Sequence, residues 1–182
     1  MSSAQNSGGA RQEFLSNTMH VRAVSAWRLE EELRAALDAN AIKPWFQPIV
    51  TLEDQKTVGY EALARWEHGE EGWISPGLFI PVAEDSGLIT HLGITILQQA
   101  CAALVAIHQA DPQNTDLWVS VNLAARQLEE TDLVQQISEI VSSAGLEPKH
   151  LKLEVTETAF IQQAANAAQV LTELRDLGFR IS

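Results

Sequence analysis

From Val58 onward, the sequence alternates between short apolar segments typical of strands and longer segments with the apolar spacing of helices. The strand-type segments cover residues 57–66, 117–124, 151–157 and 179–182. This alternation predicts a parallel sheet whose strands are joined by right-handed helical crossovers. Two architectures satisfy it, a doubly wound sheet and a (β/α) barrel. No glycine-rich phosphate loop follows the first strand, which disfavours a Rossmann-type sheet.

The connecting segments carry recognisable start and stop signals. Residues 45–52 form an apolar run that contains Pro48, so we expect an edge or terminal strand there. Residues 67–73 are polar and are expected to form a long loop. Ser75 precedes a proline in the manner of a helix N-cap, and Gly87 is expected to end that short helix. Further helices are expected over residues 23–40, 93–108, 131–144 and 160–177.

Composition narrows the class of protein. The 182 residues correspond to about one domain. The net charge of -12 argues against non-specific binding to DNA, because such binders attract phosphates with basic surfaces. A single cysteine, Cys101, allows no disulfide within one chain. We find no signal peptide and no run of about 20 apolar residues, and therefore expect a cytoplasmic chain without a membrane span.

Three strand segments each carry one polar residue that an apolar strand does not explain. These residues are Glu61, Asn122 and Glu154. Polar groups at the carboxyl ends of several strands are typical of barrel enzymes, so this pattern favours the barrel. Carboxylate and amide oxygens suit Mg²⁺ or Mn²⁺ rather than Zn²⁺. Such an ion would neutralise a phosphate and activate a water, and two ions about 3.5–4 Å apart would hold both the attacking and leaving oxygens. Arg65 is placed to hold a phosphate oxygen.

A structural explanation of the same residues competes with this one. Glu61 could pair with Arg65 or Arg126 as a structural ion pair, and Asn122 could cap a turn. Weaker candidates are Cys101 with His108 as a nucleophilic pair, and His68 as a metal ligand; we expect a buried thiol and a solvated loop histidine instead. The five tryptophans are too scattered for a stacking platform, and most are expected in the core.

Several longer motifs resemble those of the EAL family of cyclic di-GMP phosphodiesterases. Glu61-Ala62-Leu63 matches the three residues that give the family its name. The likeness extends over residues 26–182, with the motifs in the family's order and at its spacing. These motifs are FQPIV, VGYEALARW, ISPGLFIPVAEDSGLI, SVNLAARQL and LEVTET.

The resemblance implies a TIM-like (β/α) barrel whose first strand is antiparallel to the others. It implies metal-dependent hydrolysis of cyclic di-GMP to the linear dinucleotide, with two Mg²⁺ or Mn²⁺ ions. Carried over by motif, the metal ligands are Glu61, Asn122 and Glu154, with Glu61 central to catalysis. The same transfer gives Gln47, Leu63 and Arg65 to the dinucleotide, and gives Glu157 the role of ordering a loop that affects dimerisation and metal binding.

The sequence departs from the family after Ser182, where an Asp-Asp pair followed by Phe-Gly-x-Gly would come next. We therefore expect about the first half of the barrel plus an incipient strand over residues 42–182, preceded by a lead-in helix over 19–41 and a flexible tail over 1–18. Such a chain is expected to be inactive alone and to self-associate, with an upstream regulatory domain in the native protein. The alternative is a non-catalytic EAL-like module that binds cyclic di-GMP or a partner protein.

Overall fold

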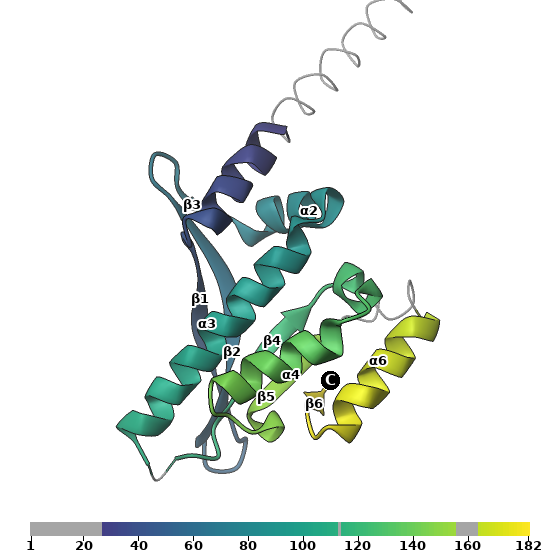
Figure 1. Cartoon of the computed structure of the whole chain (residues 1–182). Helices are drawn as coiled ribbons and strands as arrows, with labels where there is room; N and C mark the ends of the chain where they lie inside the picture. Colours follow the sequence, from purple (N-terminus) through teal and green to yellow (C-terminus); the bar gives the residue numbers. More distant parts are fainter. Residues whose placement is uncertain (1–26, 113, 156–163) are drawn as a thin grey trace, which may run out of the picture.

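The computed structural model describes residues 27–112, 114–155 and 164–182, and these residues form one sheet with helices laid across it (Figure 1). The strand order is β1-β2-β4-β5-β6, and β3 pairs with the free end of β2. Strands β2, β4, β5 and β6 are parallel to one another, as the alternation predicts. The strands are β1 (Ile42–Val50), β2 (Thr57–His68), β3 (Gly72–Ile74), β4 (Trp118–Leu123), β5 (Leu151–Val155) and β6 (Arg180–Ile181).

Strand β1 lies at the edge of the sheet and runs antiparallel to β2. Its register places Gln47 opposite Glu61 and Trp45 opposite Leu63. Pro48 has no amide hydrogen to give to a second neighbour, which suits an edge position. Both expectations for this segment, an edge strand and an antiparallel first strand, are confirmed.

The expected long loop over residues 67–73 is wrong. Strand β2 continues to His68, turns, and pairs with β3 so that Trp66 faces Ile74. Both of these side chains are buried, so the hairpin is held by apolar contact at its base. His68 Nδ1 accepts the backbone N–H of Glu71 at 3.1 Å within the turn. Polar composition therefore concealed a short strand that one buried apolar pair, Trp66 with Ile74, anchors.

Two helices follow with no loop between them. Helix α2 (Pro76–Ser86) begins at Ser75, whose hydroxyl accepts the N–H of Gly77 at 3.3 Å, as the N-cap signal predicts. Gly87, at φ 82°, ends α2 and directly precedes α3 (Leu88–Ala110). Helix α3 thus begins five residues earlier than expected, because the left-handed glycine reverses the chain without extra residues.

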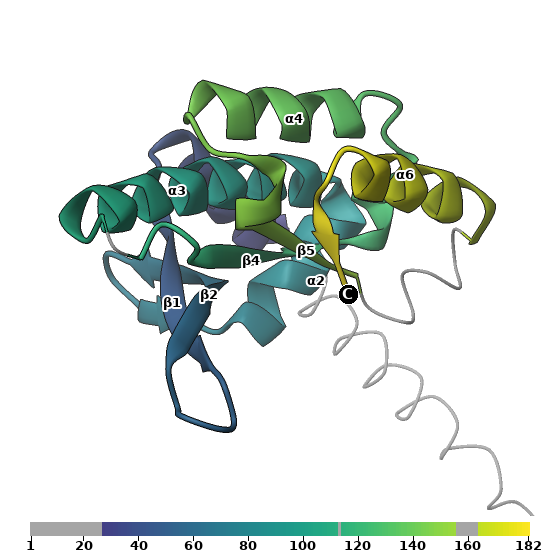
Figure 2. The ribbon, with the colours of Figure 1, turned by 90° about the horizontal axis from the view of Figure 1, so that it is seen from below.

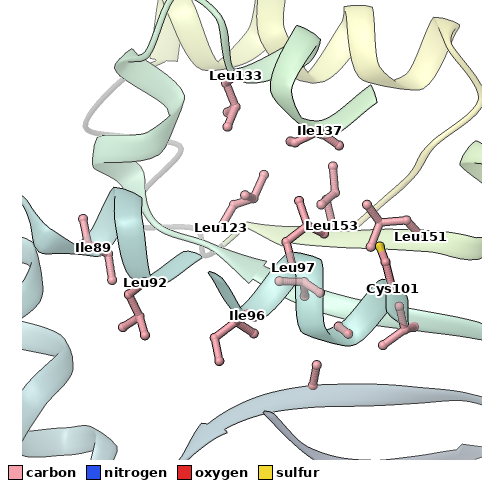
Figure 3. Packing of buried hydrophobic residues seen from close by; sticks show 14 of the residues in the cluster. Ile89, Leu92, Ile96, Leu97, Cys101, Leu123, Leu133, Ile137, Leu151 and Leu153 are labelled. Atoms are coloured by element: carbon pink, nitrogen blue, oxygen red, sulfur yellow. The ribbon is translucent and has the colours of Figure 1, made fainter. Parts of the chain in front are cut away.

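The expectation that the chain has no apolar segment of membrane-spanning length is corrected by helix α3. The helix has 23 residues, and an 18-residue window within it has a mean hydropathy of 1.6. Among the described residues it is the one helix long and apolar enough to cross a membrane by length and composition. Its buried side chains, among them Ile96, Leu97 and Cys101, pack against the sheet and against α4 (Figure 3).

The remaining elements complete the helical layer on one side of the sheet (Figure 2). Helix α4 (Leu133–Ser143) buries Leu133, Ile137 and Val141, which are the predicted apolar stripe apart from the half-buried Ile140. Helix α6 is described over Ala164–Asp176; residues 160–163 of the expected helix lie outside the described residues. Short 3₁₀ turns, η1 (Ala125–Glu129) and η2 (Pro148–His150), and a helix over residues 27–38 complete the elements.

Alternation along the parallel strands gives the sheet two unlike faces. Ala62, Val121 and Leu153 lie level with one another on neighbouring strands, and all three are buried in the core beneath the helices. Their predecessors Glu61, Ser120 and Lys152 are also level, and point to the opposite face. The face away from the helices is therefore polar.

Gly59 provides a test of how closely β2 and β4 pack. It lies level with Trp118, and a Cβ atom at this position would approach the indole Cδ2 at 2.6 Å and the Trp118 carbonyl oxygen at 2.7 Å. We expect Gly59→Ala to lower the free energy of unfolding by about 2 kcal/mol, because a backbone atom must move. Gly69→Ala, where a Cβ meets nothing within 4 Å, is the matched control. Equal urea midpoints for the two variants would contradict the prediction.

Candidate functional site

The three polar strand residues come together on the open face of the sheet. Glu61 of β2 lies level with Ser120 of β4, so Asn122 lies one pleat further along β4. The Asn122 side-chain amide donates to Glu61 Oε1 at 3.2 Å. Glu154 of β5 lies level with Asn122. Three neighbouring parallel strands thus bring two carboxylates and an amide together. Asn122 and Glu154 are next to the last residues of β4 and β5, whereas Glu61 lies near the middle of β2.

Glu154 is held by two further hydrogen bonds on one of its oxygens. Ser120 Oγ donates to Oε1 at 2.6 Å, and Lys152 Nζ donates to the same atom at 3.0 Å. Burial raises the pKa of the Glu154 carboxyl, but the hydrogen bonds from Ser120 and Lys152, together with the lysine charge, outweigh it and leave the pKa below its ordinary value. Glu154 is therefore ionised and oriented at neutral pH.

The structural ion pair proposed for Glu61 is not formed among the described residues. Within the described ranges, no ion pair joins Glu61 to Arg65 or to Arg126. Arg65 Nη1 donates to the carbonyl of Ala64 at 2.9 Å, and Arg126 Nη1 donates to the carbonyl of Glu84 at 3.0 Å. Both arginines are thus engaged with the backbone, and the carboxylate of Glu61 contacts Asn122 instead.

A cavity of about 450 Å³ opens at the carboxyl ends of β2 and β4. Leu63, Arg65 and Asn122 line it on the strand side, and apolar residues of α2 and α3 line the other side. Gly93 permits the close approach of α3 to η1, since a Cβ there would overlap with the side chain of buried Gln127. A mostly apolar cavity with a few polar groups at its rim is typical of a small-molecule site.

The other expected ligand residues lie beside this edge. Gln47 is exposed on β1 and lies opposite Glu61, while Leu63 lies opposite Trp45. Directly opposed residues of an antiparallel pair share a face, so Gln47 and Trp45 belong to the polar face. Glu157 lies outside the described residues.

The expectation that most of the five tryptophans lie in the core is wrong, because Trp27, Trp45 and Trp73 are exposed. The Trp45 and Trp73 ring centroids are 5.0 Å apart in an edge-to-face contact, and the two residues are 54% and 55% exposed. They are 28 positions apart in the sequence, but β1 and β3 pair with different parts of β2 and so bring them together. Only the strand register brings these two rings together, and a search for aromatic residues close in sequence does not use it.

The weaker candidates have structural roles. Burial raises the pKa of the Cys101 thiol to about 11, so it is a poor nucleophile at neutral pH. His108 Nε2 contacts the carbonyl of Leu117 at 2.9 Å, and its ring packs edge-on against His150 at 5.1 Å between centroids. The expectation of an inert, buried thiol agrees with these contacts.

The donor set at the strand ends suits a hard divalent cation. Two carboxylates and one amide oxygen are the ligand types that Mg²⁺ and Mn²⁺ prefer. In the part of the chain that is described, no group of three or more His, Cys, Asp or Glu side chains could hold a metal. Glu61, Asn122 and Glu154, two carboxylates and one amide, fall short of such a group.

The fold and the site together define a class: α/β proteins of the barrel type with oxygen donors at the carboxyl ends of parallel strands. The EAL domain model matches residues 30–182, and the chain belongs to the EAL domain family. The described residues form part of its TIM-like barrel, which confirms the fold class expected from the sequence.

Relatives and solved structures agree with this assignment. The chain is 36% identical over 170 residues to the cyclic di-GMP phosphodiesterase NbdA of Pseudomonas aeruginosa, covering 93% of this chain and 22% of NbdA. It is similar to the structure of the PaMucR phosphodiesterase in complex with c-di-GMP, with a TM-score of 0.78 and 36% identity over 85% of this chain and 62% of that one. The EAL enzyme Bd1971, bound to cAMP and cyclic-di-GMP, gives a TM-score of 0.83 at 29% identity, over 94% of this chain and 46% of that one. The chain therefore spans between about a fifth and three-fifths of the proteins it matches.

Ser120 is a residue that the sequence analysis missed, and its role can be measured. Because the folded-state pKa of Glu154 is lowered, its hydrogen bonds stabilise the fold above the unfolded pKa of about 4.3 and are lost as pH falls through the folded pKa. We expect Ser120→Ala to cost about 2 kcal/mol of unfolding free energy at pH 7 and progressively less below pH 4. Ser142→Ala, an exposed serine in α4, is the control. A cost that did not change with pH would contradict this account.

Proposed function

We propose that this chain is part of a cyclic di-GMP phosphodiesterase domain, which hydrolyses one phosphodiester of the cyclic dinucleotide to give the linear form. Family membership and the relatives' names support the substrate. The observation that carries the proposal is the contact of Asn122 with Glu61 at 3.2 Å, with Glu154 level with Asn122 on the next strand. Of these three donors, Asn122 also lines the cavity that Arg65 lines.

The proposed metals are two Mg²⁺ or Mn²⁺ ions. Glu61, Asn122 and Glu154 would hold them through side-chain oxygens. When bound, such ions lower the pKa of a coordinated water and neutralise charge on the phosphate. The residues of this chain would do the rest: Ser120 fixes the Glu154 carboxylate, and Asn122 fixes that of Glu61.

The dinucleotide would lie along the polar face and the cavity. Arg65 presents a planar, permanently charged fork at the cavity rim, which suits a phosphate oxygen. Leu63 lines the same cavity, and Gln47 lies across β1 from Glu61. Glu157 is proposed, by resemblance alone, to order a loop that affects metal binding and dimerisation. Location in the cytoplasm, self-association and an upstream regulatory domain are also proposals.

A binding module that does not hydrolyse its ligand is the second candidate. Each Mg²⁺ or Mn²⁺ ion takes about six ligands, and the described residues offer three side-chain donors at this edge. One of these donors, Glu154, is already neutralised by Lys152. These observations favour binding without turnover by the 182-residue chain alone.

Isothermal titration calorimetry with cyclic di-GMP, with and without Mn²⁺, tests both candidates. We expect Mn²⁺-dependent binding that Glu61→Gln weakens at least about tenfold, because the variant removes a charged metal ligand. Glu67→Gln, an exposed position on the same strand, should bind as the unmodified chain does.

Chromatography of the same mixtures separates enzyme from module. We expect the 182-residue chain to release no linear dinucleotide, because the described residues offer fewer donors than each metal ion requires. Product formation that Glu61→Gln abolishes would instead establish hydrolysis by this chain. Failure of the unmodified chain to bind cyclic di-GMP with Mn²⁺ present would refute both candidates.

A further inference from the structure

Lys152 lies on the polar face directly before the proposed metal ligand Glu154. It is level with Ser120 of β4 on one side and with Arg180 of β6 on the other. Alternation along β5 directs Lys152 and Glu154 to the same face and sends Leu153 into the core. The proposed function gives this lysine no part in metal or substrate binding, although it lies beside a carboxylate that is proposed to bind metal.

The lysine ammonium makes an ion pair with that carboxylate. Lys152 Nζ lies 3.0 Å from Glu154 Oε1, and the two side chains are 25% and 28% exposed. Ser120 Oγ donates to the same oxygen. A cation that binds this end of Glu154 must therefore displace the ammonium or accept its charge close by.

The same ammonium also lies over an aromatic ring. Lys152 Nζ is 5.4 Å from the centroid of Trp118, which is a cation–π distance, and Arg180 contacts the same ring at 5.4 Å. Gly59 on β2 leaves the room in which the indole lies. Lys152 thus has two favourable partners on one face, the Glu154 carboxylate and the Trp118 ring.

We propose that Lys152 is a positioning residue that substitutes for the metal charge at Glu154 and competes with metal binding there. This rests on the proposed function, because it requires Glu154 to be a metal ligand. Without metal, the ammonium keeps the carboxylate paired and oriented. With metal, the ammonium withdraws from Glu154 and keeps its contact with Trp118.

Mn²⁺ alone is the probe for this competition. The full chain and three variants are titrated with Mn²⁺, and free ion is followed by electron paramagnetic resonance. We expect Lys152→Met to bind Mn²⁺ about tenfold more tightly, since it removes a positive charge beside the ligand. Lys152→Arg keeps the charge and should bind like the unmodified chain. Lys149→Met makes the same charge change three residues away, where Lys149 pairs with Glu147 at 2.9 Å, and should have no effect.

Thermal unfolding in EDTA supplies a second readout that needs no metal. Lys152→Met leaves Glu154 without its cation, so we expect its melting temperature to fall by about 4 °C and to recover when Mn²⁺ is added. In a Glu154→Gln background, Lys152→Met should neither tighten Mn²⁺ binding nor lower the melting temperature. If Lys152→Met folds poorly, Lys152→Gln takes its place.

The outcomes separate this proposal from the proposed function. Equal Mn²⁺ affinity in Lys152→Met and the unmodified chain would overturn the role of Lys152 and leave the metal site standing. Failure of every protein to bind Mn²⁺ would overturn both. Tighter binding in Lys152→Met that also appears in Lys149→Met would show a general charge effect and would overturn the proposal.

Discussion

The register of the three central parallel strands is the constraint on which the rest of the molecule depends. One row of residues, Ala62, Val121 and Leu153, is buried beneath the helices. The residues beside each of them, among them Glu61, Asn122 and Glu154, must then face the other way. A shift of one residue in any strand would exchange the two sets and bury charge. Core packing on one face thus fixes the polar site on the other.

Strong local patterns allowed most of the architecture to be predicted. The parallel alternation, the edge strand with Pro48 and the N-cap at Ser75 follow from residue types whose backbone preferences are strong. Hairpin β2–β3 and the early start of α3 were missed. The hairpin depends on the pairing of Trp66 with Ile74, and the start of α3 depends on the left-handed conformation of Gly87 between two helices.

The candidate site also contains residues that the sequence analysis named and residues that it missed. Glu61, Asn122 and Glu154 could be found from sequence, because a carboxylate or amide in an apolar strand is unfavourable without a partner. Ser120 and Lys152 could not, since a serine or a lysine in a strand is unremarkable until the register shows that both contact one oxygen of Glu154. The contact between Trp45 and Trp73 was missed for a related reason, because it joins two strands that both pair with β2.

The distribution of charge over the molecule connects Lys152 to the rest of the polar face. The chain carries a net charge of -12 with 12 Lys and Arg residues. Four of these, Lys43, Arg65, Lys152 and Arg180, lie on the face that holds Glu61 and Glu154, as the register and the contacts with Trp118 indicate. Concentrated cations on one face of an acidic protein attract an anion to that face and away from the others. One of them, Lys152, pairs with the Glu154 carboxylate in the absence of metal, so the sheet does not depend on metal to offset that charge.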